Sequence, residues 1–238
     1  LTVQEKLEIA RQLDRLGVDI IEAGFAASSP GDFEAVQTIA RELRRPMIVS
    51  LARCHVGDVD AAWEAIKDAE DPRIHVFISS SDVQIMNQLR SDPERVMDLA
   101  VQSVERAKSY CDNVEFSPMD ATRTDPDYLY AMLEAVINAG ATTVNIADTV
   151  GYTFPTEFAE RIGRTLAKVV NRLESLDDER EKSYNQLLTL QARLNTQVTT
   201  SHTGGCQIAA DCQVQRTIQH IEALQFQIIG LCHLRALR

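Results

Sequence analysis

The fold is decided by the stretch VDIIEAGF at residues 18–25. It is short and rich in the branched residues that buried parallel strands favour, so it predicts a strand inside a sheet. A helix is predicted before it, because Thr2 and Glu5 form a capping box and apolar residues then recur at helical spacing as far as Gly17.

The same alternation continues along the chain. Ser29 as an N-cap, with Pro30 at the first helical position, predicts a helix that ends near Arg44 and Arg45. The elements predicted after it are, in order, a strand at Met47–Ala52, a helix at Val56–Ala69, a strand at Ile74–Ser79, a helix at Pro93–Tyr110, a strand at Val114–Ser117, a helix at Pro126–Asn138, a strand at Thr142–Ala147 and a helix from Pro155.

This alternation fixes the class of fold. Strands that alternate with helices imply right-handed βαβ units and a parallel sheet, which leaves a (β/α)₈ barrel and a doubly wound sheet as candidates. A doubly wound sheet that binds a dinucleotide carries a G-x-G-x-x-G turn after a strand, and no predicted strand is followed by one here. We therefore predict an α/β protein with a (β/α)₈ TIM barrel.

The pattern changes after Leu166. Apolar residues then follow a three-four spacing on both sides of a charged block at residues 177–182, which predicts a long helix or a helical hairpin packed against the barrel. Beyond it, two strands are predicted at residues 197–201 and 224–229. We predict a partial barrel domain at residues 1–167 and a helical and irregular segment at residues 168–238.

The composition narrows the class of protein. The chain has 238 residues, of which 45% are hydrophobic and 25% charged, as expected for a soluble globular domain. Its formal net charge of -11 opposes binding to nucleic acid. No apolar stretch approaches the roughly 18 residues that cross a membrane, and the five scattered cysteines suggest reduced thiols. We expect a cytoplasmic protein without a membrane or nucleic-acid partner.

Polar residues stand where the predicted strands end, which is where barrel enzymes build their active sites. They are Glu22, Arg53, His75, Ser79, Asp120, Arg123 and Thr149. Structural alternatives exist for them: Glu22 would pair with Arg53, His75 would be a satisfied residue of the barrel interior, and Thr149 would cap a turn. Their shared place at one rim favours a functional site.

Five segments carry a resemblance to a known family. They are IEAGF at 21–25, SLARC at 50–54, RIHVFI at 73–78, VEFSP at 114–118 and NIADTVGY at 145–152. In this order and spacing they resemble the 2-isopropylmalate synthases and, more widely, the homocitrate, citramalate and methylthioalkylmalate synthases. The resemblance covers roughly residues 1–167, and so many linked motifs in order make it highly specific.

The resemblance implies a Claisen-type condensation of acetyl-CoA with 3-methyl-2-oxobutanoate in leucine biosynthesis. Glu22 and Arg53 are the catalytic residues expected from it. His75, Ser79 and Thr149 are the expected substrate-binding residues. It also implies a homodimer and a divalent metal, Mg²⁺ or Mn²⁺, because the keto oxygen gains charge as the new bond forms.

The chain departs from the family pattern at the metal site. The family's Arg-Asp-Gly-Glu-Gln stretch, with a metal-ligand Asp and a substrate Arg, is absent, and so the first barrel strand is expected to be missing. The family's acidic residue after Ser-Pro is Met119 here, which cannot bind a hard cation. Of the family's His-x-His pair only His202 is matched, since Gly204 stands in the second place, which leaves His202 as the candidate metal ligand.

Two other functions stay open at the level of sequence. One is a citramalate or homocitrate synthase-like enzyme, because pocket shape sets the acceptor and one methylene is worth only about 1–3 kcal/mol of discrimination. The other is a catalytically inactive, truncated barrel that acts as a binding or assembly partner, which the missing strand and Met119 suggest.

Overall fold

The computed structural model describes residues 1–169, 171, 182, 185–186 and 189. The chain divides into one unit at Leu1–Leu166 and a second unit at Ala167–Arg238. The fold described below is that of the first unit. All but a few residues of the predicted hairpin, both predicted strands beyond it and the candidate metal ligand His202 lie outside the described residues.

The centre of the first unit is a parallel sheet of five strands in the order β1-β2-β3-β4-β5. The strands are β1 (Ile20–Gly24), β2 (Met47–Arg53), β3 (Pro72–Ser79), β4 (Asn113–Met119) and β5 (Thr143–Val144). Each strand pairs with its neighbour in sequence, as in a barrel, whereas a doubly wound sheet reverses direction partway. The described part is therefore an incomplete (β/α)₈ barrel, as predicted.

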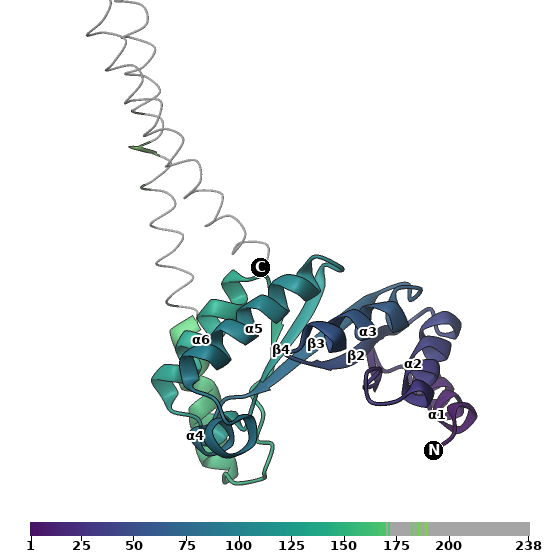
Figure 1. Ribbon diagram of the computed structural model, residues 1–238, viewed down its shortest axis with the longest axis horizontal. Helices are drawn as coiled ribbons and strands as arrows, with labels where there is room; N and C mark the ends of the chain where they lie inside the picture. Colours follow the sequence, from purple (N-terminus) through teal and green to yellow (C-terminus); the bar gives the residue numbers. More distant parts are fainter. Residues whose placement is uncertain (170, 172–181, 183–184, 187–188, 190–238) are drawn as a thin grey trace, which may run out of the picture. The chain divides into compact units, whose positions relative to one another are not determined.

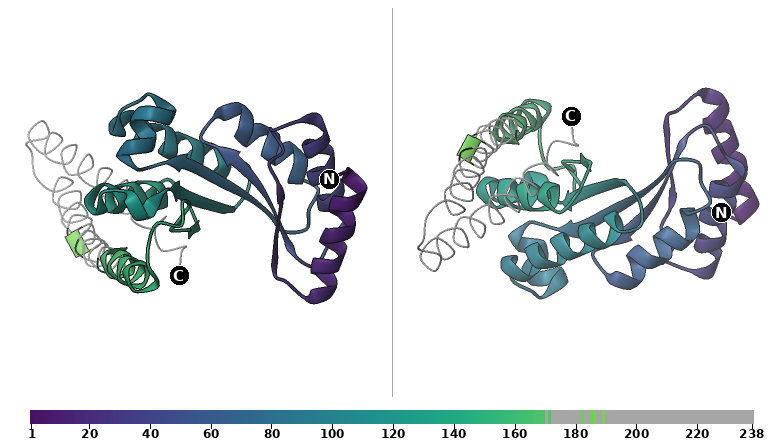
Figure 2. Two further views of the ribbon diagram at one scale, coloured as in Figure 1. Left: turned by 90° about the horizontal axis from the view of Figure 1, so that it is seen from below. Right: turned by 90° about the horizontal axis from the view of Figure 1, so that it is seen from above.

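Helices connect the strands and pack in a row along the sheet. They are α1 (Val3–Leu16), α2 (Pro30–Glu42), α3 (Val56–Ile66), the short α4 (Asp82–Gln84) with the π-helix η1 (Ile85–Leu89), α5 (Pro93–Lys108), the 3₁₀ turn η2 (Ala121–Arg123) and α6 (Pro126–Asn138), and residues 155–169 are also helical. Helix α2 lies between α1 and α3, and α5 lies between α3 and α6 (Figure 1). The purple N-terminal helix and the green helix of residues 155–166 lie at opposite ends of the row (Figure 2).

The helix starts predicted from the sequence are confirmed. The Thr2 hydroxyl accepts the Glu5 backbone N–H at 3.2 Å, while the Glu5 carboxylate accepts the Thr2 N–H at 2.7 Å. At the end of α1, Gly17 takes the left-handed conformation with φ +89°, which glycine adopts without steric penalty. The Ser29 hydroxyl caps α2 by accepting the Asp32 N–H at 3.1 Å.

The hydrophobic core lies between the sheet and the helices. Ile74 and Val76 of β3, Ile48 of β2 and Phe116 of β4 are fully buried there. Side chains alternate between the two faces of a strand, so His75 lies on the face opposite to Ile74 and Val76. One face of the sheet is thus covered by helices, and the other carries polar side chains such as His75 and Glu115 among apolar ones such as Val49 and Leu51.

Two regions differ from the prediction. The predicted strand Thr142–Ala147 was too long: β5 spans only Thr143 and Val144, although the Asn145 N–H still donates to the Phe116 carbonyl of β4 at 3.0 Å. The helical turn and π-helix at residues 82–89 were not predicted, because this segment is short and lacks a regular apolar period. Within the described residues no helix is both long and apolar enough to cross a membrane.

Candidate functional site

His75 is the centre of a hydrogen-bonded network on the polar face of the sheet. Its Nδ1 atom lies 2.5 Å from Oε2 of Glu22, and its Nε2 atom lies 2.6 Å from Oγ of Ser117. The Asn145 side-chain amide donates to the same Ser117 oxygen at 3.0 Å. With Nδ1–H donating to the Glu22 carboxylate, Nε2 accepts the Ser117 hydroxyl proton, and each of the hydrogen bonds that link Glu22, His75, Ser117 and Asn145 then has one donor and one acceptor.

A buried ion pair lies next to this network. Arg73 of β3 and Glu115 of β4 meet at 3.2 Å between Nη1 and Oε2, with side-chain exposures of 11% and 17%. The other Glu115 oxygen lies 3.9 Å from Nε2 of His75. The Glu22 side chain is 47% exposed whereas His75 is 10% exposed, so Glu22 is the end of the network that solvent or a substrate can reach.

Two sequence-based predictions about these residues are wrong. His75 was expected where a strand ends, but it lies in the middle of β3, four residues before Ser79. The proposed pairing of Glu22 with Arg53 is also absent, because Glu22 lies two residues before the end of β1 and contacts His75, whereas Arg53 is the last residue of β2. The alternative in which His75 is a satisfied interior residue matches its contacts.

Arg53 is held by a neighbouring carboxylate. Its Nε and Nη2 donate to the two oxygens of Asp58 at 2.6 and 3.2 Å, and its guanidinium carbon lies 5.3 Å from the centre of the Phe25 ring. The hydrogen bond to Asp58 is the main reason that the pKa of Arg53 is raised. The side chain remains 61% exposed, so one face of a fixed cation is available to an anionic ligand.

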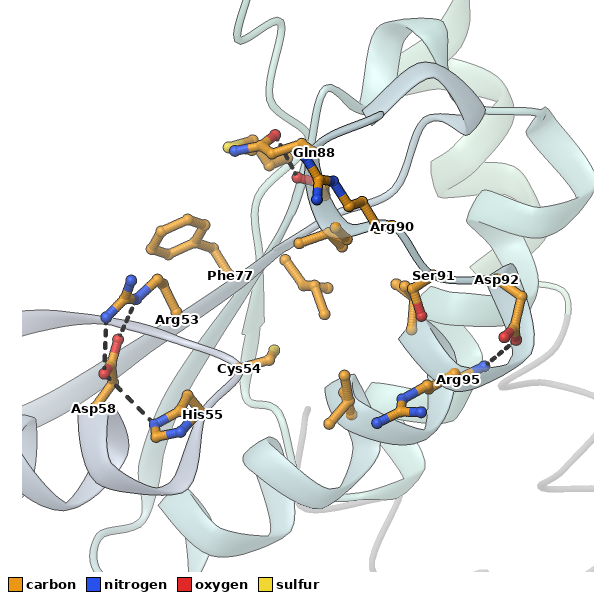
Figure 3. A pocket seen from close by; sticks show the side chains of 16 residues that line it. Arg53, Cys54, His55, Asp58, Phe77, Gln88, Arg90, Ser91, Asp92 and Arg95 are labelled. Carbon is orange, nitrogen blue, oxygen red and sulfur yellow. Dashed lines mark hydrogen bonds and ion pairs between the residues drawn. The ribbon is translucent and has the colours of Figure 1, made fainter. Parts of the chain in front are cut away.

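Ser79 and Arg53 line the same cavity, which lies at the ends of β2, β3 and β4 (Figure 3). The Ser79 hydroxyl donates to Oε1 of Gln88 at 3.2 Å. The cavity has a volume of about 740 Å³, which is within the range of small-molecule sites. Parallel strands place their carboxyl ends at one edge, and this edge is where barrel enzymes bind substrates.

Asp120 forms a third group directly after β4. Asp120 is completely buried, and its backbone has the left-handed conformation with φ +67°. Its carboxylate accepts hydrogen bonds from Nη2 of Arg123 at 2.6 Å and from the Ser81 hydroxyl at 2.5 Å. Burial acts to raise the pKa of Asp120, but the hydrogen bonds from Arg123 and Ser81 outweigh it, and the pKa is lowered. The Asp120 backbone N–H donates to Oγ1 of Thr149 at 3.0 Å. Thr149 therefore ties the loop after β5 to the end of β4.

Asp148 organises the same loop. Its two carboxylate oxygens accept the hydroxyls of Thr122 and Thr153 at 2.7 and 2.8 Å and the backbone N–H groups of Tyr152 and Thr153. These hydrogen bonds, with that from Thr122 the strongest, lower the pKa of Asp148 to about 2. Asp148 is thus a charged structural cap that keeps Thr149 in place.

The predicted rim residues fall into three local groups. Glu22 and His75 are in direct contact; Arg53 and Ser79 share the cavity; Asp120, Arg123 and Thr149 form the third group. Within the described residues no hydrogen bond or ion pair joins one group to another. The predicted rim residues therefore lie together only within each of these three groups. A single ligand would have to contact more than one group to connect them.

Sequence reasoning missed three residues that hold polar side chains in this region. Asp58, Glu115 and Ser117 hold Arg53, Arg73 and His75 respectively. A signal existed for two of them, since Glu115 and Ser117 alternate with the apolar Val114 and Phe116 and so share the polar face of β4. Asp58 carried no comparable signal, because a helix surface is rich in carboxylates.

The described residues do not supply a metal site. No group of three or more His, Cys, Asp or Glu side chains in this part of the chain could hold a metal ion. Met119, in place of the family's acidic residue, lines the cavity with a thioether that hard cations do not bind. The prediction of His202 as a ligand lies outside the described residues.

Known proteins resemble the chain over its first part. The HMGL-like family matches residues 1–177. A protein from Syntrophus aciditrophicus named 2-isopropylmalate synthase is 62% identical over 167 residues, which cover 70% of this chain and 32% of that protein. Proteins of the same name from Ruminiclostridium cellulolyticum and Pyrococcus furiosus are 54% and 56% identical, over 74% and 72% of this chain and 34% of each protein. The chain spans about a third of the length of these relatives.

A solved structure supports the same fold. The crystal structure of hydroxymethylglutaryl-CoA lyase from Pseudomonas aeruginosa superposes with a TM-score of 0.60 at 19% sequence identity, over 71% of this chain and 58% of that chain. At this identity the likeness concerns the fold alone. Because the family match extends over 177 of the 238 residues, the chain belongs to the HMGL-like family.

Proposed function

We propose that this chain carries out the 2-isopropylmalate synthase reaction, in which acetyl-CoA condenses with 3-methyl-2-oxobutanoate. The observation that carries the proposal is the 62% identity over 167 residues to a protein of that name. The other two relatives described above bear the same name, which favours this acceptor over those of citramalate and homocitrate synthases. The names of these relatives do not favour the inactive, truncated barrel.

The first step needs a base. A proton leaves the methyl group of acetyl-CoA, and the resulting enolate forms a carbon–carbon bond to the keto carbon of the acceptor. Glu22 is suited to accept that proton, because its carboxylate is about half exposed and His75 fixes one oxygen at 2.5 Å. Ser117 in turn fixes His75, so the base keeps one orientation without a conformational search.

In the second step the acceptor must be held in place while the enolate attacks it. The keto oxygen becomes an alkoxide when the new bond forms and takes up a proton to give the product hydroxyl. Water then attacks the thioester carbon, the carbon–sulfur bond breaks, and CoA leaves as the free thiol. Arg53 is suited to hold the carboxylate of the acceptor, because its guanidinium is fixed by Asp58 while most of the side chain is exposed. The hydroxyls of Ser79 and Thr149 are further proposed contacts to the substrates.

The family resemblance also supports a divalent metal, which would stabilise charge on the keto oxygen. The described residues do not form a ligand set for such an ion. His202 is the proposed ligand from the remainder of the chain. We further propose that the protein is a cytoplasmic homodimer. Light scattering on the purified protein measures its mass and so tests the oligomeric state.

The function is tested by the release of free CoA thiol. The purified full chain is mixed with acetyl-CoA, 3-methyl-2-oxobutanoate and Mg²⁺ or Mn²⁺, and the thiol is measured with a chromogenic disulfide reagent. We expect turnover that depends on the oxoacid and falls at least about 100-fold in Glu22→Gln, the usual range for loss of a general base. Glu34→Gln, an exposed carboxylate on α2, is the matched control and should retain activity.

Two results would contradict the proposal. The first is no thiol release above the rate without the oxoacid. The second is equal activity in Glu22→Gln and Glu34→Gln, which would exclude Glu22 as the base. Faster turnover with pyruvate or 2-oxoglutarate than with 3-methyl-2-oxobutanoate would point to the citramalate or homocitrate alternative.

A further inference from the structure

Arg73 is a buried cation that no step of the proposed reaction uses. It lies on β3 two residues before His75, on the same face of the sheet, and only 9% of the residue is exposed. Its Nη1 atom donates to Oε2 of Glu115 at 3.2 Å. Its Nε atom is buried and has no hydrogen-bond partner within the described residues. A buried N–H without a partner is destabilising, so packing alone does not explain why an arginine stands here.

Glu115 lies between Arg73 and His75. It is directly opposite His75 in the register of β3 against β4, which lie side by side in the sheet (Figure 1). One carboxylate oxygen accepts the hydrogen bond from Arg73, and the other lies 3.9 Å from Nε2 of His75. The Glu115 side chain is 17% exposed, so solvent screens its charge only weakly. Glu115 is therefore close enough to His75 to influence where the protons of the ring lie.

The charges around His75 are of both signs. In the part of the chain that the structure describes, the charged side chains that face the ring are Glu22 of β1, Arg73 of β3 and Glu115 of β4. The neighbour of His75 on β2 is the apolar Leu51, and the group at Nε2 is the neutral hydroxyl of Ser117. Without the cation, His75 would lie between two carboxylates, an arrangement that favours the doubly protonated imidazolium ion.

We propose that Arg73 is a positioning residue that keeps His75 in the singly protonated form on which the proposed base, Glu22, depends. Because Arg73 holds the Glu115 carboxylate, that group does not draw a proton onto Nε2, and Nε2 stays an acceptor for the Ser117 hydroxyl. The neutral ring donates Nδ1–H to Glu22 and orients it without a full positive charge beside it.

The protonation of His75 matters because of what it does to Glu22. A carboxylate next to an imidazolium ion is a weaker base, since the adjacent cation stabilises its negative charge. A neutral His75 fixes the Glu22 carboxylate and leaves it able to accept a proton. This role of Arg73 in catalysis rests on the proposed function, whereas its effect on the protons of His75 does not.

The protons of His75 can be observed directly by NMR. In the purified full chain with nitrogen-15 in its histidine rings, the two ring nitrogens have different chemical shifts in each neutral tautomer and in the imidazolium ion. The chain has five histidines, and the signals that vanish in His75→Gln are those of His75. At about pH 7 we expect the original chain to show a neutral ring with its proton on Nδ1.

Arg73→Gln tests the charge of Arg73. The amide can still donate a hydrogen bond to Glu115 but carries no charge, so His75 should take up a proton from water and show the imidazolium signature at about pH 7. Arg73→Gln combined with Glu115→Gln removes both charges and should restore the neutral ring. Arg45→Gln is the matched control: it removes an arginine that pairs with Asp14 at 2.9 Å and should leave the His75 signals unchanged.

Thiol release tests the catalytic part of the proposal. If Glu22 is the base, Arg73→Gln should lower turnover about tenfold, because the base keeps its position but accepts a proton less readily. The KM for the oxoacid should change less than about twofold, since Arg73 is proposed to act through His75 and not on the substrate. The variant without both charges should recover most of the turnover.

The NMR signals of His75 decide the proposal. A neutral ring in Arg73→Gln would overturn it, as would an imidazolium ring in the original chain at about pH 7, or the same change in Arg45→Gln. If Arg73→Gln does not fold, Glu115→Gln takes its place: at about pH 5.5 it should show less imidazolium than the original chain, and an equal or larger share would overturn the proposal. An imidazolium ring in Arg73→Gln, together with no condensation by the original chain, would contradict the proposed function alone.

Discussion

Replacing Asp120 with alanine tests how the end of β4 is stabilised. The substitution removes a fully buried carboxylate that accepts hydrogen bonds from Arg123 and Ser81. A hydrogen bond to a charged group contributes about 1.5–3 kcal/mol. Because the Arg123 side chain is 31% exposed, solvent screens its interaction with Asp120, and its contribution lies at the lower end of this range. We therefore expect Asp120→Ala to lower the free energy of unfolding by about 3 kcal/mol.

Equilibrium unfolding in urea, followed by circular dichroism, measures this loss. A change of about 3 kcal/mol corresponds to a fall in melting temperature of roughly 6–12 °C for a domain of this size. Asp120→Asn is the matched control, because it keeps the shape and an acceptor for Ser81 while it removes the charge, and it should cost only about 1–1.5 kcal/mol. Aspartate and asparagine also tolerate the left-handed backbone at this position, whereas alanine does not.

A cycle with Arg123→Gln completes the experiment. If the carboxylate acts mainly through Arg123, Asp120→Asn and Arg123→Gln should be non-additive by about 1 kcal/mol. Additive effects, or a loss below about 1 kcal/mol in Asp120→Ala, would refute the reasoning that this buried ion pair stabilises the end of β4.

Three other predictions follow from the described contacts. Thr149→Val should lower the unfolding free energy by about 1 kcal/mol, because the Asp120 N–H loses its acceptor; an unchanged melting temperature together with lost thiol release would instead make Thr149 a substrate contact. The pKa of Asp148 is lowered to about 2 from 3.8, so its contribution to stability is complete above about pH 4 and is lost as the pH falls towards 2; Asp148→Asn should flatten this part of the pH–stability curve, and an unaltered curve would contradict the assignment. Phe116→Ala should cost about 3–5 kcal/mol in urea unfolding, since the ring is completely buried, and a loss below 1 kcal/mol would show that it is not a core residue.

The fold was predictable because its signals are local. A capping box at Thr2, the Ser29–Pro30 start of α2 and short apolar strands each depend on neighbours within a few residues, and each is present in the structure. The end of β5 was not predictable in the same way. Apolar residues continue after Val144 as Ile146 and Ala147, but Ala147 accepts the N–H of Ala121, beyond the end of β4, at 3.1 Å, and no local pattern encodes that contact.

The sequence predicted which residues lie near the ends of the strands, but not which of them contact one another. Strand ends located Arg53 and Ser79 correctly, since parallel strands place their ends at one edge. Choosing the partner of Arg53 required the geometry of α3, where Asp58 lies in the first turn of the helix and accepts hydrogen bonds from the Arg53 guanidinium. Likewise, only the register of β3 against β4 brings Ser117 to His75.

The unequal pairing of the strands has a consequence for local opening. Strand β3 is bonded along its length to β2 and β4, whereas β5 pairs with β4 at two positions only. Amide hydrogens of β3 should therefore exchange with deuterium only on global unfolding, and those of β5 through brief fraying of the edge. The His75 network would then stay fixed while the loop that bears Thr149 samples other positions, so the two ends of the rim differ in how readily they adjust to a bound molecule.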